Sequence, residues 1–208
     1  MSIESHGRST SAPATYTRPA RDDVRAAVVQ AAGELFTRHG YAATTLGEIA
    51  KAAGFTKGAI YSNFGGKPEL FAAAMAVRLD RQQGAAIQSA ARLSAGQSTE
   101  LARQLTQLVV TDTWVLLMSE FRVVAHRDPA TANVYADLRR QAQTDLADRL
   151  RSNADSLHLA ADLDHEAAAV MLLTLISGLA GEHVLAPDVT TPALIEAALL
   201  RVISGLLR

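Results

Sequence analysis

The chain of 208 residues contains no cysteine. Disulfide bonds, thiolate catalysis, thiol redox sensing and cysteine-ligated zinc are therefore excluded. Aromatic residues make up only 5% and prolines number six, whereas hydrophobic residues reach 49%, the bulk of them alanine, leucine and valine. Alanine and leucine are strong helix formers, and few prolines are present to break their helices. The composition therefore predicts an all-α protein with a sizeable core.

The N-terminal 20 residues lack the apolar stretch of a secretory signal, so we expect a cytoplasmic protein. Residues 1–20 are instead rich in serine, threonine, alanine and proline, which predicts a disordered tail. Arg8, Arg18 and Arg21 lie where a basic arm could reach a DNA minor groove, although a plainly solvated tail is the simpler interpretation.

The net charge is only −1, which argues against a general nucleic-acid coat protein. Its distribution is more informative, because residues 1–70 carry a net charge of +2 and residues 71–208 a net charge of −3. All three lysines, at positions 51, 57 and 67, fall within 17 residues. A small basic part joined to an acidic part is typical of local DNA binding.

Apolar spacing predicts four helices in the first part of the chain, over residues 22–39, 46–53, 57–64 and 67–92. Thr45 followed by Glu48 forms a capping-box pattern, and Thr56 can cap the third helix. Two helices of about eight residues joined by a tight turn at Gly54 have the dimensions of a helix-turn-helix. The outward face of the third helix offers donors and small side chains suited to a major groove about 12 Å wide.

Residues 21–75 resemble the DNA-binding domain of TetR-type repressors. The resemblance rests on Phe36, Gly40-Tyr41, Thr44-Thr45, Ile49-Ala50, Ala53-Gly54, Lys57-Gly58, Ile60-Tyr61, Phe64, Lys67 and Leu70. It implies that the third helix reads operator bases and that the lysine opening the fourth helix meets a phosphate. The DNA-binding residues that follow from this are Thr45, Lys57, Gly58, Ala59, Tyr61, Ser62, Asn63 and Lys67.

The sequence departs from the family pattern at three positions of the second and third predicted helices. Gly47 stands where such proteins often have a basic or polar DNA contact, and Ser62-Asn63 replaces bulkier aromatic and histidine residues. We interpret both departures as a different operator sequence and not as a lost function.

The second part of the chain predicts helices over about 99–126, 129–152, 164–184 and 191–207. Residues 167–175 are almost wholly apolar, but the run is too short and too flanked by charge for a membrane span. By resemblance, the last two helices form a four-helix dimer interface with their symmetry mates, which implies a palindromic operator. The organisation expected is a tail over 1–20, a helix-turn-helix domain over 21–66, and an effector-binding and dimerisation domain over 67–208.

Large apolar side chains with a few polar groups among them predict a small-molecule pocket in this second part. The candidate effector-binding residues are Trp114, Met118, Phe121, Arg122, Tyr135 and Met171, although for any one of them ordinary core is the simpler interpretation. Arg139 and His126 come from the same two central helices, with His126 better explained as a helix-end residue. The scarcity of charge along this stripe favours a lipophilic effector, and we expect its binding to act through the fourth helix.

An enzyme is the main rival class, and its signatures are missing. Gly65-Gly66-Lys67 is followed by proline and lacks the first glycine of a phosphate loop, so that match fails. The acidic cluster at 162–166 is better explained as a helix cap than as a metal site, so no metal or cofactor is expected. An activator, a repressor that needs a corepressor, and a DNA-binding protein regulated by a protein partner stay open.

Overall fold

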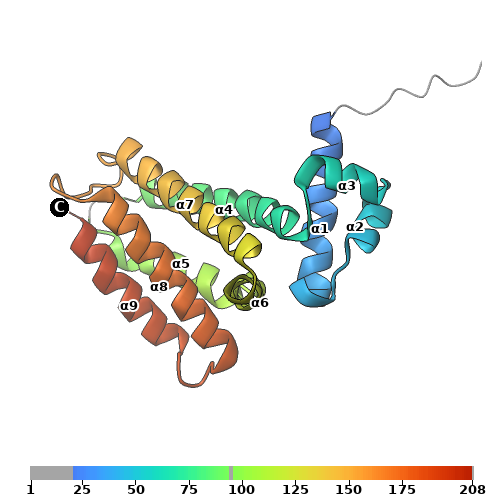
Figure 1. Ribbon diagram of the computed structural model, residues 1–208. Helices are drawn as coiled ribbons and strands as arrows, with labels where there is room; N and C mark the ends of the chain where they lie inside the picture. The colour runs from blue at the N-terminus through green and yellow to red at the C-terminus, as the bar shows by residue number, and fades with distance from the viewer. Residues whose placement is uncertain (1–20, 94–95, 208) are drawn as a thin grey trace, which may run out of the picture.

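The computed structural model describes residues 21–93 and 96–207, so the predicted tail over 1–20 lies outside the described part. Within these ranges the chain forms nine α-helices and no β-strand (Figure 1), which confirms the all-α prediction. The helices are α1 (Arg21–Ala43), α2 (Leu46–Ala53), α3 (Lys57–Phe64), α4 (Lys67–Ala91), α5 (Ser98–Thr111), α6 (Trp114–Arg127), α7 (Pro129–Ser152), α8 (His165–Leu185) and α9 (Pro192–Leu206).

Helices α1, α2 and α3 lie together at one end of the molecule, and α4 leads from them into the larger group of helices (Figure 1). The predicted bounds of α2 and α3 agree with the observed ones. The span of α1 reaches Ala43, but its regular helix is interrupted at Gly40, whose φ of +84° and ψ of 166° are not helical, so the break falls where the sequence predicts the end of the first helix. A left-handed φ of this kind favours glycine, which explains that residue.

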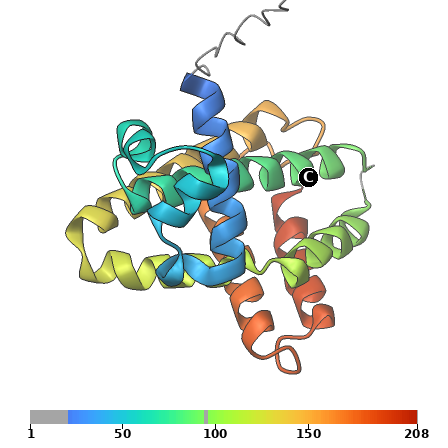
Figure 2. The same cartoon turned by 90° about the vertical axis from the view of Figure 1, so that its right-hand side faces the viewer.

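The core of α1–α3 continues without a break into the larger group of helices. Phe36 and Phe71 meet edge to face with their ring centroids 5.1 Å apart. Phe121 from α6 joins them, with its ring 4.7 Å from that of Phe71 and 5.2 Å from that of Tyr41. Figure 2 shows α1 crossing in front of α4 and α6, against which it packs in addition to α2. The helix-turn-helix end is therefore fixed to α4 and α6 by one aromatic cluster.

The prediction of a single helix over 99–126 is wrong, since α5 ends at Thr111 and α6 begins at Trp114. Asp112 takes an extended backbone, and its carboxylate accepts a hydrogen bond from the backbone N–H of Trp114 at 3.0 Å. The same carboxylate forms an ion pair with Arg78 of α4 at 2.6 Å. The break is thus stabilised by a residue 34 positions away, which no local pattern reveals.

Helices α8 and α9 lie side by side on the side of the molecule away from α1–α3 (Figure 1). Helix α8 is long and apolar enough to cross a membrane by length and composition alone, and only 22% of its most apolar window is buried in the monomer. Its exposed side chains include Val170 and Met171, and Leu194 is exposed on α9. Helix α8 therefore leaves an apolar surface exposed in the single chain.

Candidate DNA interface and effector cavity

Side-chain caps fix the start of both helices in the helix-turn-helix. Thr45 Oγ1 accepts from the backbone N–H of Glu48 at 3.2 Å, while the Glu48 carboxylate accepts from the backbone N–H of Thr45 at 2.8 Å. The Thr45 hydroxyl also donates to the Glu48 carboxylate at 2.8 Å, and this bond, together with the one from the Thr45 N–H, lowers the pKa of Glu48 because both favour its charged form. Thr56 Oγ1 accepts from the N–H of Ala59 at 3.2 Å. Gly54, at φ +76°, makes the tight turn between the two helices.

Helix α3 separates into a buried face and an exposed face. Ile60 and Phe64 are buried against the rest of the domain, as the sequence predicts. Tyr61 exposes 56% of its surface, and the remaining fully exposed positions of α3 are Lys57, Gly58 and Ser62. Ala59 is half-buried. The exposed face therefore combines an ammonium, two hydroxyls and a glycine, a mixture that can make hydrogen bonds in a DNA groove.

Asn63 is held differently from the other predicted DNA contacts. Its amide donates to Ala59 O at 2.7 Å and accepts from Arg21 Nε at 3.3 Å. Arg25 donates to the Asn63 carbonyl at 3.0 Å, and its guanidinium lies 4.5 Å from the centre of the Phe64 ring. Asn63 thus connects α3 to α1 in this structure, and its predicted base contact would need these bonds to break.

Gly47 lies directly beneath the side chain of Lys57. A Cβ atom on Gly47 would come within 2.7 Å of Lys57 Cε and 3.2 Å of Lys57 Nζ, with Thr45 Oγ1 at 3.8 Å. The side chain of Lys57 therefore fills the space that a larger residue at position 47 would need. The sequence singled out Gly47 as a missing DNA contact, and the structure adds that a lysine from α3 occupies its place.

The side chain of Lys67 contacts the C-terminal end of α1. Its ammonium donates to Ala42 O at 3.0 Å and lies 4.6 Å from the centre of the Tyr41 ring. Burial lowers the pKa of Lys67, and burial also raises the pKa of Tyr41 to about 12. An ammonium carries three donors, so two donors of Lys67 remain for a phosphate.

A cavity of about 260 Å³ lies in the second part of the molecule, between helices α4 to α9. Trp114, Met118 and Arg122, three of the candidate effector-binding residues, line it from successive turns of α6. Arg139, which the sequence analysis named beside them, lines the cavity from α7. Most of the remaining lining is leucine, isoleucine, valine and alanine. The cavity can therefore take up an apolar molecule.

Three candidate effector residues lie outside this cavity lining. Phe121 is buried in the aromatic cluster with Tyr41 and Phe71, and Tyr135 lies beside Phe121 with the ring centroids 6.2 Å apart. Met171 is 41% exposed on the outer face of α8. For these three residues the structure favours the alternative of packing or surface positions, because apolar spacing shows which residues share a helix face but not what that face packs against.

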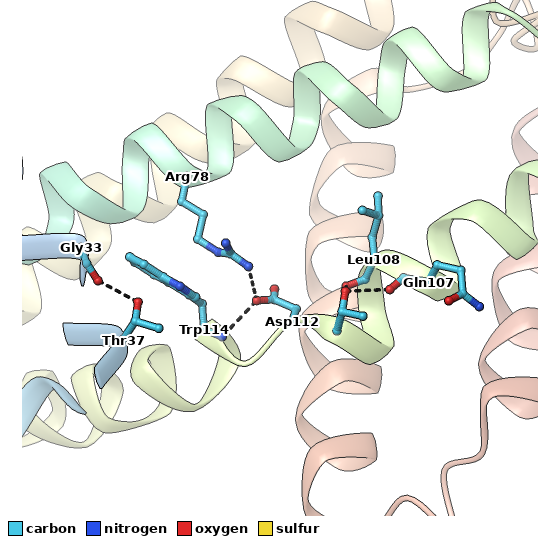
Figure 3. Close-up of polar contacts among 8 residues, drawn as sticks. Gly33, Thr37, Arg78, Gln107, Leu108, Asp112 and Trp114 are labelled. Carbon is cyan, nitrogen blue, oxygen red and sulfur yellow. Dashed lines mark hydrogen bonds and ion pairs between the residues drawn. The ribbon is translucent and has the colours of Figure 1, made fainter. Parts of the chain in front are cut away.

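Arg78 and Asp112 are cavity residues that the sequence analysis missed. The Arg78 guanidinium lies 5.0 Å from the centre of the Trp114 ring and forms the ion pair with Asp112 (Figure 3). The Trp114 ring also reaches α1, where a Cβ on Gly33 would be 3.5 Å from Trp114 Cη2. This cluster of Arg78, Asp112 and Trp114 thus joins the cavity wall to the DNA-binding end. Only the fold brings its members together, since α4 and α6 are far apart in sequence.

Helix α6 makes two further contacts with α1. The Glu120 carboxylate accepts from the backbone N–H of Ala42 at 3.0 Å, and Phe121 packs on Tyr41. One side of α6 therefore faces the cavity and another side contacts α1. In the described part of the chain, no group of three histidine, cysteine or acidic residues could hold a metal ion.

Comparison with known proteins places these features in a family. Residues 28–74 match the bacterial regulatory proteins of the tetR family, and residues 98–208 match the C-terminal part of BetI-type transcriptional repressors. The chain is 30% identical to the probable HTH-type transcriptional regulator ArpR of Pseudomonas putida, over 83% of this chain and 85% of that one. It is 29% identical to the HTH-type transcriptional regulator TtgR, also of Pseudomonas putida, over the same shares. A TetR-family regulator from Rhodococcus sp. has the same fold, with a TM-score of 0.67 and 19% identity over 90% of this chain and 100% of that one.

Proposed function

The chain belongs to the TetR family of bacterial DNA-binding transcriptional regulators. We propose that it is a homodimeric cytoplasmic repressor. In this proposal the dimer occupies a palindromic operator and leaves it when a small lipophilic effector fills the cavity. The observation that carries the proposal is the capped helix-turn-helix, with the exposed face of α3 directed away from the core. Its relatives are regulators, which supports a role without catalysis.

The proposed DNA contacts follow from exposure and position. Tyr61, Ser62 and Lys57 are exposed on α3 and are the strongest candidates for the groove and its edges. Gly58 and Ala59 allow the helix backbone to approach the bases closely. Thr45 and Lys67, at the N-termini of α2 and α4, are suited to phosphates, because helix N-termini present free N–H groups and positive potential. Asn63 stays a predicted contact, but its side-chain amide must first break its hydrogen bonds with Ala59 and Arg21.

Selection from a randomised duplex pool by the purified protein tests this part of the proposal. We expect enrichment of an inverted repeat whose half-sites are separated by about one helical turn. Tyr61→Ala should reduce the affinity for the selected site more than the affinity for unrelated DNA. A pool with no enriched sequence, or an enriched site without two-fold symmetry, would contradict it.

We propose that α8 and α9 form the dimer interface, as the sequence analysis expected for residues 164–184 and 191–207. Exposed positions on α8 recur at helical spacing and are mostly apolar or small, namely Ala167, Val170, Met171, Thr174 and Gly178. Small residues along such a stripe let two helices approach closely. A second copy would cover the apolar surface that the monomer leaves open, so a membrane is not needed to explain it.

Light scattering on a sizing column tests the interface. Met171→Glu places a charge on the exposed stripe of α8, and the expected product is a folded monomer. The matched control is Val123→Glu, because Val123 is also an exposed apolar residue, at 52%, but lies on α6. A dimeric Met171→Glu variant together with a monomeric Val123→Glu variant would place the interface elsewhere.

We propose that the effector acts through α6 as well as through the long helix α4. An effector beside Trp114 competes for the space between Arg78 and α1, and α6 also holds α1 through Glu120 and Phe121. A shift of α6 would therefore move α1 together with the helix-turn-helix. Such a shift alters the spacing of the two reading helices in a dimer and lowers operator affinity.

A further inference from the structure

The charged residues that line the effector cavity are mostly of one sign. They are three arginines, Arg78, Arg122 and Arg139, and one aspartate, Asp112, which leaves a net charge of +2 with histidine neutral. The Asp112 carboxylate is already held by Arg78 at 2.6 Å. Two guanidinium groups of the lining are therefore without a carboxylate of their own.

Arg122 and Arg139 have no hydrogen-bond, ion-pair or ring partner among residues 21–93 and 96–207. Arg122 lies on α6 one turn beyond Met118, and Arg139 follows Leu138 on α7, the helix packed against α6. Arg122 is exposed and Arg139 half-buried although both line the cavity, so they mark a place where the cavity reaches solvent. Two unpaired guanidiniums at the opening of an apolar cavity raise the local concentration of anions.

The rest of the lining completes the description of a two-part site. Away from the arginines, the wall is formed by apolar side chains of α7, α8 and α9, among them Leu146, Leu150, Leu173 and Ile203. Such a wall favours an extended apolar group, whereas the arginines favour a carboxylate or another anion that accepts two N–H donors at once.

We propose that the effector is an amphipathic anion: its charged group binds Arg122 and Arg139, and its apolar part lies along the leucine-rich wall. This inference rests on the proposed function, which supplies the lipophilic effector, and adds the charge of its head group. A cationic amphiphile is disfavoured for two reasons. It would meet the net positive charge, and the face of Trp114 that could bind a cation already has the Arg78 guanidinium 5.0 Å from its centre.

Three probes of equal chain length test the charge preference directly. Decanoate, decan-1-ol and decyltrimethylammonium are titrated into the full chain at pH 7.5, each below its critical micelle concentration. Trp114 is the only tryptophan in the chain and lines the cavity, so its fluorescence reports occupancy without any DNA. We expect decanoate to bind about tenfold more tightly than decanol, because charge-assisted hydrogen bonds replace neutral ones. Decyltrimethylammonium should bind more weakly than decanol.

Matched variants separate the arginines of the cavity from a general charge effect. In the double variant Arg122→Gln, Arg139→Gln, the affinity for decanoate should fall to within about threefold of that for decanol, while decanol binding stays unchanged. The control is Arg140→Gln, because Arg140 is an exposed neighbour of Arg139 that pairs with Asp137 at 2.5 Å and does not line the cavity. It should bind all three probes as the unmodified chain does.

The outcomes distinguish this inference from the proposed function. Equal affinity for decanoate and decanol, or tightest binding of the ammonium, would overturn the anionic effector and leave a lipophilic effector in place. A decanoate preference that survives the double variant would also overturn it, since other groups would then hold the anion. A cavity that binds none of the probes would contradict the lipophilic effector itself and this inference with it.

Discussion

Replacing Gly47 with alanine is expected to displace Lys57 without removing a charge or disturbing the fold. The new Cβ would stand 2.7 Å from Lys57 Cε, closer than any real contact, so the end of the lysine must move, by about 0.7 Å to reach the 3.4 Å of an ordinary contact. The atoms that must move belong to the end of a flexible side chain, so the displacement is cheap. Alanine also has the higher helix propensity, and the free energy of unfolding should stay the same or rise by up to about 1 kcal/mol.

The expected loss in DNA binding can be worked out from counterion release. If Lys57 contacts one phosphate, its loss removes about 0.9 from the slope of log K against log salt, which at 0.15 M corresponds to about fivefold in affinity. A dimer on a palindrome loses two such contacts. Its affinity should therefore fall about 30-fold, and the slope of log K against log salt should fall by about 1.8. Lys57→Ala should show this full loss, and Gly47→Ala, which displaces the ammonium, should show up to the same loss. The double variant Gly47→Ala, Lys57→Ala should bind no more weakly than Lys57→Ala alone.

Fluorescence anisotropy of a labelled operator over a series of salt concentrations measures the operator affinity and its salt slope. Urea unfolding verifies that each variant is folded. Arg81→Ala is the charge control, because Arg81 is exposed on α4 outside the helix-turn-helix. Wild-type affinity and salt slope in Gly47→Ala would show that the new Cβ does not displace Lys57 from the DNA. So would additive losses in the double variant, because they would mean that the two residues act independently.

Three further predictions concern stability and coupling. Thr45→Ala removes the capping box and should cost about 1 kcal/mol in the free energy of unfolding, measured with urea; an unchanged value would mean that the cap contributes nothing. Gly33→Leu introduces a side chain where the ring of Trp114 lies and should weaken operator binding in anisotropy titrations without effector, whereas Gly33→Ala, whose Cβ stands at an ordinary 3.5 Å, should not. Hydrogen bonds from Arg103 lower the pKa of Glu100 to about 2, and hydrogen bonds from Thr131 lower that of Asp128. As the pH falls, these carboxylates take up protons at a higher pH in the unfolded chain than in the folded one. Their contribution to the free energy of unfolding is therefore present above pH 4.5 and is lost as the pH falls toward 2, which urea midpoints across that range would reveal.

The local signals in this sequence located the helix-turn-helix correctly. Capping residues, the Gly54 turn and short apolar spacing are interactions between residues a few positions apart, so they can be read without knowing the fold. The same is true of Pro129, whose position at the start of α7 agrees with the predicted bound. Family resemblance added the function, because the motif residues in 21–75 recur together in TetR-type repressors.

Other features depend on contacts between distant parts of the chain. The break at Asp112 needs Arg78 from α4, and the role of Phe121 depends on Tyr41 and Phe71 lying against it. Spacing along α6 predicted one stripe of pocket residues. In the folded protein the stripe is divided, with Trp114 in the cavity lining and Phe121 in the aromatic cluster.

Helix propensity, caps and motif residues are local properties, so the amino-acid sequence is enough to predict an all-α chain with a DNA-binding helix-turn-helix. Which residues surround the cavity, and which connect it to the DNA-binding end, depends on how the helices pack in the folded protein. The same packing places Lys57 over Gly47 and binds Asn63 to α1. The physical reason is that the direction in which a helix face points is set by the helices packed against it, and those helices come from elsewhere in the chain.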